Sequence, residues 1–182
     1  IIDYNKIMAT KELIRKQNVI GWFQGRMEWG PRALGNRSIL ADARNKDNWQ
    51  HVNLKIKFRE SFRPLAPAVL REKSEKYFNW PTDSSFMLFV AKVKNDDIPA
   101  VTHVDNSARL QIVDQQTNPL FYNLIKSFDD LTGCSVIINT SFNKRDEPIV
   151  CILEDSWDTF LETDLDFLVL GNYTIDKRDI KK

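Results

Sequence analysis

Short apolar runs alternate with amphipathic segments along this chain of 182 residues, and this alternation most limits the folds available to it. The runs 18–23 (NVIGWF) and 165–170 (LDFLVL) have the length of buried strands, whereas the apolar residues of 118–132 follow helical spacing. Helices and strands follow no strict strand–helix–strand order. We therefore predict an α+β fold with a mixed, twisted β-sheet flanked by helices. A parallel, doubly wound sheet is the alternative.

Local signals set the expected element boundaries. Pro31 can begin a short helical turn over 31–35, and Gly133 can end the preceding helix. The apolar run FMLFV at 86–90 is assigned to the core. We expect strands at 18–23, 37–44, 85–93, 109–113, 134–142, 165–170 and 173–175, and helices at 3–17, 47–57, 71–79, 118–132 and 153–163.

Composition restricts the class of protein. The length favours a single domain over 1–182, and because the chain opens with Ile1 we expect it to be a fragment of a longer protein. A net charge of +1 makes nucleic acid an unlikely partner, and no apolar run has membrane-spanning length. Cys134 and Cys151 lie in apolar runs and are expected to be buried free thiols, which favours a cytoplasmic location. No residues show metal-ligand spacing.

The segment 25–44 (GRMEWGPRALGNRSILADAR) gathers four arginines around three glycines. Glycines there indicate positive φ or a close backbone approach, and guanidinium groups suit phosphate and carboxylate oxygens. The segment therefore suggests an anion cradle. A surface loop in which arginines pair with Glu28 and Asp42 explains it equally well.

A second basic stretch, KFRESFRP, contains Lys57, Arg59 and Arg63. Prolines at 64 and 67 favour extended chain, in which positions 57, 59, 61 and 63 share one face. Like charges on one face repel unless an anion lies between them. We favour an anion site over a solvated edge strand.

Two polar stretches complete the candidates. In 138–143 (INTSFN) an apolar strand ends in Ser141 and Asn143, which suits either a ligand at the strand end or an ordinary turn. In 102–111 (THVDNSARLQ), His103 can contact a ligand with Asp105 orienting it, or the two can form a structural hydrogen bond. Arg109 offers a further guanidinium group that can bind phosphate.

These four motifs, in this order, resemble the C-terminal domain of the NodU/CmcH/TobZ family of O-carbamoyltransferases. The resemblance runs from about residue 19 to residue 171 and implies the YrdC-like fold, shared with enzymes that make threonylcarbamoyl-adenylate. It implies that Lys57 and Arg59 are catalytic and that Ser141 and Asn143 hold the nucleotide. It also implies contacts from Arg32 and Arg37 to carbamoyl phosphate or triphosphate, with His103 and Arg109 nearby.

The reaction implied by the resemblance uses ATP and carbamoyl phosphate to form carbamoyl-adenylate, with Mg²⁺ bound through the nucleotide phosphates. A preceding N-terminal actin-like domain, holding Fe²⁺ or a similar metal, would then transfer the carbamoyl group to a hydroxyl of a small molecule or saccharide. We expect that domain to be a partner absent from this chain.

One departure from the family pattern concerns the loop after Asn143. Asp146 stands where the family usually has Gly, so positive φ there would fall on a non-glycine residue and add a negative charge. A non-catalytic nucleotide- or RNA-binding module of the same fold is the alternative function, and a purely structural domain is a third.

Overall fold

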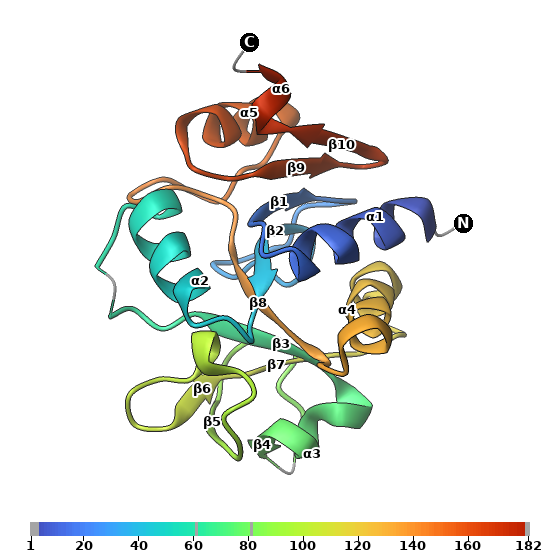
Figure 1. Cartoon of the computed structure of the whole chain (residues 1–182), viewed down its shortest axis with the longest axis vertical. Coiled ribbons are helices and arrows are strands. Elements are labelled where there is room, and N and C mark those ends of the chain that lie inside the picture. The colour runs from blue at the N-terminus through green and yellow to red at the C-terminus, as the bar shows by residue number, and fades with distance from the viewer. Residues whose placement is uncertain (1–3, 61, 81, 181–182) are drawn as a thin grey trace.

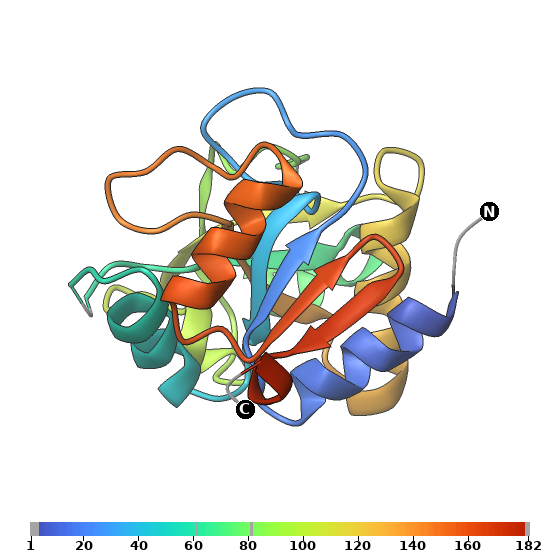
Figure 2. The same ribbon diagram turned by 90° about the horizontal axis from the view of Figure 1, so that it is seen from above.

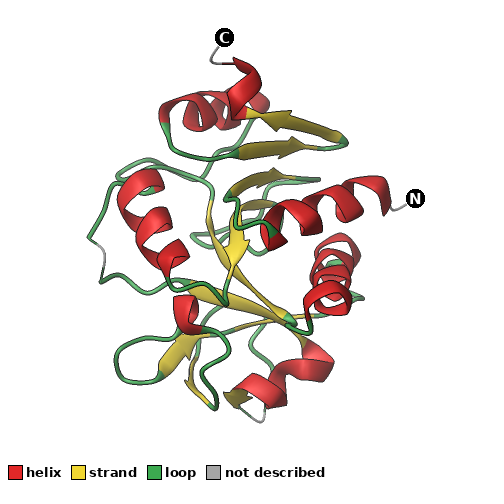
Figure 3. Ribbon diagram, in the orientation of Figure 1, coloured by secondary structure: helices red, strands yellow, loops and turns green. Residues whose placement is uncertain are grey.

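A mixed seven-stranded sheet forms the centre of the molecule in the computed structural model, which describes residues 4–60, 62–80 and 82–180 (Figures 1 and 3). Its strand order is β10-β9-β1-β2-β8-β3-β7; the β1–β9 and β3–β7 pairs are parallel and the other four are antiparallel. The strands are β1 (Ile20–Phe23), β2 (Arg37–Asp42), β3 (Ala66–Leu70), β7 (Gln111–Val113), β8 (Val136–Ser141), β9 (Phe167–Leu170) and β10 (Tyr173–Asp176). The predicted α+β class with a mixed sheet is confirmed.

Helices cover both faces of this sheet, as the view from above shows (Figure 2). Helices α1 and α4 lie side by side on one face, and α2 with α5 occupies the other (Figure 1). A smaller sheet of β4, β5 and β6 packs at one end. The remaining elements are α1 (Tyr4–Arg15), α2 (Asp47–Gln50), α3 (Ser74–Tyr77), α4 (Pro119–Thr132), α5 (Leu153–Glu162), α6 (Lys177–Ile180), β4 (Phe78–Asn79), β5 (Val90–Val93) and β6 (Ser107–Arg109), with short 3₁₀ turns at Arg71–Lys73 and Pro99–Val101.

Helix α4 begins and ends where local chemistry requires. The Asn118 side chain accepts a hydrogen bond from the Phe121 amide at 3.1 Å, Pro119 occupies the first turn, and Gly133 ends the helix with φ of 73°. A side-chain acceptor at the start and a left-handed glycine at the end satisfy backbone groups that a helix leaves unpaired. The predicted boundary of this helix is confirmed. No helix among the described residues is long and apolar enough to cross a membrane.

The expected helix 47–57 has an unexpected second half. Four α-helical residues pass into a π-helix at His51–Ile56, and the Lys57 amide donates to the Val52 carbonyl at 2.9 Å. Phe58 then adopts a left-handed φ of 47°. The extended geometry predicted from 57 onward is therefore wrong at its start, because the wide turn is followed by a reversal at Phe58.

Three further expectations are wrong. Residues 31–35 form bends without a helical turn. In the run 86–90, Phe86 and Leu88 are 62% and 72% exposed, because Met87 takes a left-handed φ of 55° and only its own side chain turns inward. Of the two cysteines, Cys134 is buried as expected but Cys151 is exposed.

Gly35 is held by close packing. Its φ is 120°, its carbonyl accepts from the buried Trp22 indole at 2.8 Å, and a Cβ on it would lie 2.5 Å from the ring of buried Phe121. Gly30 has a similar φ of 107°, but a Cβ there would meet no atom within 4 Å. The predicted need for positive φ in the glycine–arginine segment is confirmed at both positions.

We expect Gly35→Ala to lower the free energy of unfolding by about 2–4 kcal/mol, since it combines an unfavourable φ with overpacking against a side chain that cannot move. Gly30→Ala, with the unfavourable φ alone, should cost about 1 kcal/mol. Urea unfolding of both variants checks this. Equal losses would show that the Phe121 contact contributes nothing.

Candidate functional site

Two adjoining cavities at the end of β8, of about 230 and 200 Å³, form what we call the basic groove. They share Arg59, Arg63 and Ser141. The other lining residues are Pro31, Arg32, Ala33, Pro64, Met87, Arg109, Asn139 and Thr140 in the first cavity and Lys57, Asn143, Lys144, Arg145 and Asp146 in the second. Among these described residues Asp146 is the one acid against seven cations, so the groove suits an anion.

Lys57 reaches the groove from the end of the π-helix, which commonly marks functional sites. Its buried ammonium donates to the Ser141 carbonyl, to Ser141 Oγ at 3.1 Å and to the carbonyl and side-chain oxygens of Asn143. Ser141 Oγ also donates to Asn143 Oδ1 at 2.7 Å. The structure therefore brings together the two predicted pairs, Lys57 with Arg59 and Ser141 with Asn143.

The remaining groove cations face one another. Burial, together with the neighbouring Arg63 and Arg109, lowers the pKa of Arg59 to about 10. Burial and Arg32 lower the pKa of Arg109, and burial and Arg59 hold the pKa of Lys57 well below its ordinary value. In each case burial and a neighbouring cation lower the pKa, and for Arg59 the Glu60 carboxylate opposes this only in part. An anion placed among them would relieve this repulsion.

The arginines of the 25–44 segment separate into different environments. Arg32 lines the groove as predicted. Arg37 is buried, its guanidinium lies 3.4 Å from the centre of the Phe23 ring, and it donates to the carbonyls of Gln24, Gly25, Asn36 and Cys151. Because its donors are used by backbone carbonyls outside the groove, Arg37 holds the loop in place and does not line the site.

Arg44 pairs with the buried Asp42 at 2.7 Å, as the surface-loop alternative predicted. Glu28, in contrast, accepts from the backbone amides of Leu34 and Asn36 at 3.0 and 2.6 Å. Of these three arginines, only Arg32 therefore lies where the predicted anion cradle needs it.

His103 lies apart from the basic groove. It lines another cavity with residues such as Trp49, and its Nδ1 is 3.4 Å from Asp105, which also accepts from Ser107. Of the two roles predicted for His103 and Asp105, the geometry agrees with the structural hydrogen bond. Arg109, from the same motif, reaches the groove because β6 carries it there.

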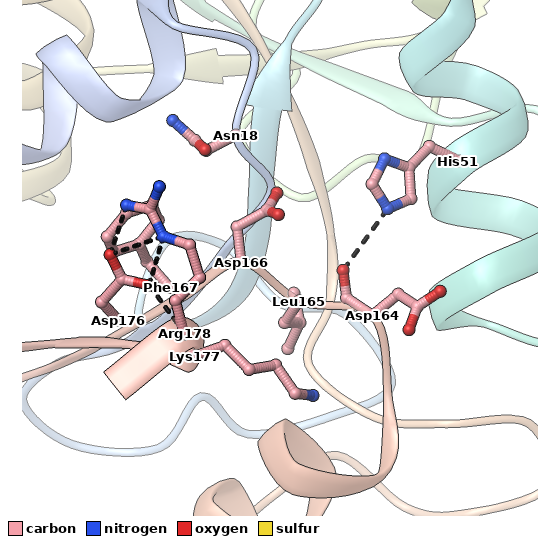
Figure 4. A pocket seen from close by; sticks show the side chains of 9 residues that line it. All are labelled: Asn18, His51, Asp164, Leu165, Asp166, Phe167, Asp176, Lys177 and Arg178. Atoms are coloured by element: carbon pink, nitrogen blue, oxygen red, sulfur yellow. Dashed lines mark hydrogen bonds and ion pairs between the residues drawn. The ribbon is translucent and has the colours of Figure 1, made fainter. Parts of the chain in front are cut away.

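A larger cavity of about 340 Å³ lies between His51 and the C-terminal elements (Figure 4). His51 Nε2 is 3.3 Å from the Asp164 carbonyl, Asp166 accepts from the Val19 amide, and Arg178 pairs with Asp176 (Figure 4). Three carboxylates, those of Asp164, Asp166 and Asp176, line it beside Lys177 and Arg178, so it offers an anion less than the basic groove does.

Comparison with known proteins shows the family and the fold of this chain. The family model described as Carbamoyltransferase C-terminus matches residues 11–177. The chain belongs to this family. Nodulation protein NolO of Bradyrhizobium diazoefficiens is 48% identical over 166 residues, which cover 88% of this chain and 30% of NolO. The 3'-hydroxymethylcephem-O-carbamoyltransferase of Streptomyces clavuligerus is 39% identical over 148 residues, covering 81% of this chain and 28% of that protein. The chain thus spans less than a third of these relatives.

Solved structures show the fold of this carbamoyltransferase C-terminal domain. The structure of P. abyssi Sua5 complexed with L-threonine matches with a TM-score of 0.69 at 14% identity, over 94% of this chain and 48% of Sua5. Full-length HypF, in its phosphate- and nucleotide-bound form, matches with a TM-score of 0.66 at 16% identity, over 91% of this chain and 25% of HypF. The predicted YrdC-like architecture is confirmed.

Groove residues that sequence reasoning missed are Lys144 and Arg145. The Lys–Arg pair directly after SFN is the signal that could have found them. Asp146 adopts a φ of 60°, as its place at a family glycine predicted, and its exposed carboxylate lies 3.4 Å from Arg145.

A dedicated metal site does not accompany the groove. Within 4–60, 62–80 and 82–180, no group of three or more His, Cys, Asp or Glu side chains could hold a metal ion. Mg²⁺ prefers carboxylate and phosphate oxygens. Among the described lining residues the groove offers one carboxylate, that of Asp146.

We expect the free energy of unfolding to rise with pH in the window between the folded-state pKa of Lys57 and its unfolded value near 10.5. In that window the unfolded chain binds more protons than the folded chain, so raising the pH favours the folded state. Urea unfolding from pH 7 to 9.5, compared with Lys57→Met, isolates this contribution. A difference between the two proteins that stays constant with pH would contradict it.

Arg109→Gln should leave the stability of the ligand-free domain unchanged or raised, because it removes one repelling cation, and should weaken phosphate binding at least fivefold. Arg44→Gln is the matched control, since it removes the partner of buried Asp42 and should cost about 1–3 kcal/mol without changing phosphate affinity. Thermal unfolding with and without phosphate measures both quantities. Equal destabilisation of the two variants would exclude mutual repulsion in the groove.

Proposed function

We propose that this domain binds ATP and carbamoyl phosphate in the basic groove and forms carbamoyl-adenylate, as one half of an O-carbamoyltransferase. The observation that carries the proposal is the convergence of Lys57, Arg59, Arg32 and Arg109 with Ser141 and Asn143 on one groove. A cavity with this excess of positive charge suits a triphosphate and a second anionic substrate.

The proposed chemistry runs through two bond changes. Water cleaves carbamoyl phosphate to carbamate and inorganic phosphate. A carbamate oxygen then attacks the α-phosphorus of ATP, the bond from that phosphorus to the bridging oxygen breaks, and pyrophosphate leaves with the electron pair. Two anions must meet and negative charge grows on the pyrophosphate, so neutralising cations lower the barrier.

Four groove cations have roles in this scheme. Lys57 donates to oxygens of Ser141 and Asn143 and would give up one of these partners to contact the α-phosphate, while Arg59 neutralises charge on the departing pyrophosphate. Arg32 and Arg109 line the cavity beside them and are suited to carbamoyl phosphate. Mg²⁺ would enter on the phosphates and neutralise further charge there.

The second half-reaction, attack of an acceptor hydroxyl on the carbamoyl carbon with departure of AMP, is proposed for the part of the relatives' chains that lies outside this match. The acceptor class is a hydroxylated small molecule or saccharide. Carbamoyl phosphate and ATP are cytoplasmic metabolites, which supports a cytoplasmic location.

Exchange of labelled pyrophosphate into ATP tests the first half-reaction. We expect exchange that depends on carbamoyl phosphate, is lost by at least a hundredfold in Lys57→Ala and falls about tenfold in Ser141→Ala. Lys126→Gln, on the exposed face of α4, is the control that should leave exchange unchanged. No carbamoylated acceptor should form.

The contrary outcomes separate the alternatives. ATP binding without exchange favours the non-catalytic nucleotide-binding module, and a salt-dependent RNA shift favours the RNA-binding one. If Asp146→Gly alone restores exchange, its carboxylate disables an otherwise intact groove. Absence of any nucleotide or phosphate binding would exclude the proposal.

A further inference from the structure

Asn139 occupies a position in β8 where an apolar side chain would be expected. It is fully buried, follows Ile138 along the strand, and pairs across the sheet with Leu40 and Ala66. Burying an amide costs free energy unless both of its ends find partners. Asn139 is nevertheless among the residues that line the first cavity of the basic groove.

The amide nitrogen of Asn139 has well-defined partners. Its Nδ2 donates to the Ala33 carbonyl at 3.1 Å and to Gln111 Oε1 at 2.7 Å, and Gln111 Nε2 in turn donates to the Leu34 carbonyl at 3.0 Å. Both Nδ2 bonds go to oxygen acceptors, which sets the orientation of the amide. The chain of bonds also ties the loop that carries Arg32 to β7 and β8.

The other end of the amide has no such partner. Asn139 Oδ1 is buried without a hydrogen-bond partner among the described residues, and so is Arg109 Nε, on the lining of the same cavity. One atom is an acceptor and the other a donor. The charged side chains of this cavity are all arginines, which only donate, so a simple anion would satisfy Arg109 and leave Asn139 unpaired.

We propose that Asn139 Oδ1 accepts a hydrogen bond from the amino group of the carbamoyl substrate and so distinguishes it from other small acyl or inorganic phosphates. A carbamoyl group presents an NH₂ donor beside an oxygen acceptor, which matches the unpaired acceptor of Asn139 and the donor of Arg109. A methyl group at the same place, as in an acetyl group, leaves the buried acceptor unsatisfied. The proposal rests on the proposed function of the groove and names the residue that sets its specificity.

A purely structural role for Asn139 explains the bonds of its amide nitrogen but not the burial of its amide oxygen. The two bonds from Nδ2 hold the Arg32 loop, but they make no use of Oδ1. A site built to pair with a substrate N–H rejects the analogue that lacks it, because the polar group of the site is then left buried and unpaired. For Asn139 to select the substrate in this way, the protein needs no polar group beyond those already in the cavity.

The test compares two stable, isosteric phosphonates, phosphonoacetamide and 2-oxopropylphosphonate, which differ in having NH₂ or CH₃ on the carbonyl. Calorimetric titration of the full chain, with inorganic phosphate as a third probe, should give about tenfold tighter binding of the amide. In Asn139→Leu this preference should vanish, and the phosphate affinity of the same variant measures how far the loss of the Nδ2 bonds loosens the Arg32 loop.

Equal affinity for the two phosphonates in the unsubstituted protein would overturn the role of Asn139, even if Asn139→Leu did not fold. If that equal binding still fell in Arg109→Gln, the groove would stand as an anion site and only the specificity proposal would fail. If none of the three probes bound, the proposed function itself would fail, and the role of Asn139 with it.

Discussion

The buried ammonium of Lys57 is the interaction on which the arrangement of the groove depends. It joins the end of the π-helix to the end of β8 through four oxygens of two residues. A charge removed from water must be surrounded by acceptors to be tolerated, so the turn at Ser141–Asn143 has to stay in place. Arg59 and Arg63 are then carried to the same opening. The site and its local fold are therefore stabilised by the same contacts.

The basic groove also illustrates how function and stability oppose each other in this domain. Arg44 neutralises a buried carboxylate and Arg37 donates to backbone carbonyls, whereas Arg59 and Arg109 lie beside other cations, which together with burial lower their pKa values. Arg44 and Arg37 stabilise the fold, whereas the groove arginines lower its stability. This contrast between neighbouring arginines is the physical mark of a ligand site.

Features with local causes could be predicted from the sequence. Helix α4 has its cap, proline and terminal glycine within one segment, and the positive φ at Asp146 follows from the family glycine it replaces. The meeting of Lys57 with Ser141, across 84 positions, came from resemblance and not from spacing. The roles of Arg32 and Arg37 could not be distinguished from the sequence. Tertiary contacts alone decide that Arg32 lines the groove and that Arg37 holds the loop in place. Phe86 and Leu88 were misplaced because a left-handed Met87 cannot be inferred from an apolar run.

The π-helix at His51–Ile56 has a consequence for how this groove can change. A turn of this kind holds an extra residue compared with the α-helix it interrupts. The length of this turn therefore sets the direction in which the Lys57 side chain extends from the end of the helix. Loss of a single residue anywhere in that turn would restore ordinary α-helical winding and rotate the ammonium away from β8, with every groove side chain still present in the sequence. Alignment gaps in this short stretch thus carry more information about whether a related groove is intact than the identity of its charged residues does.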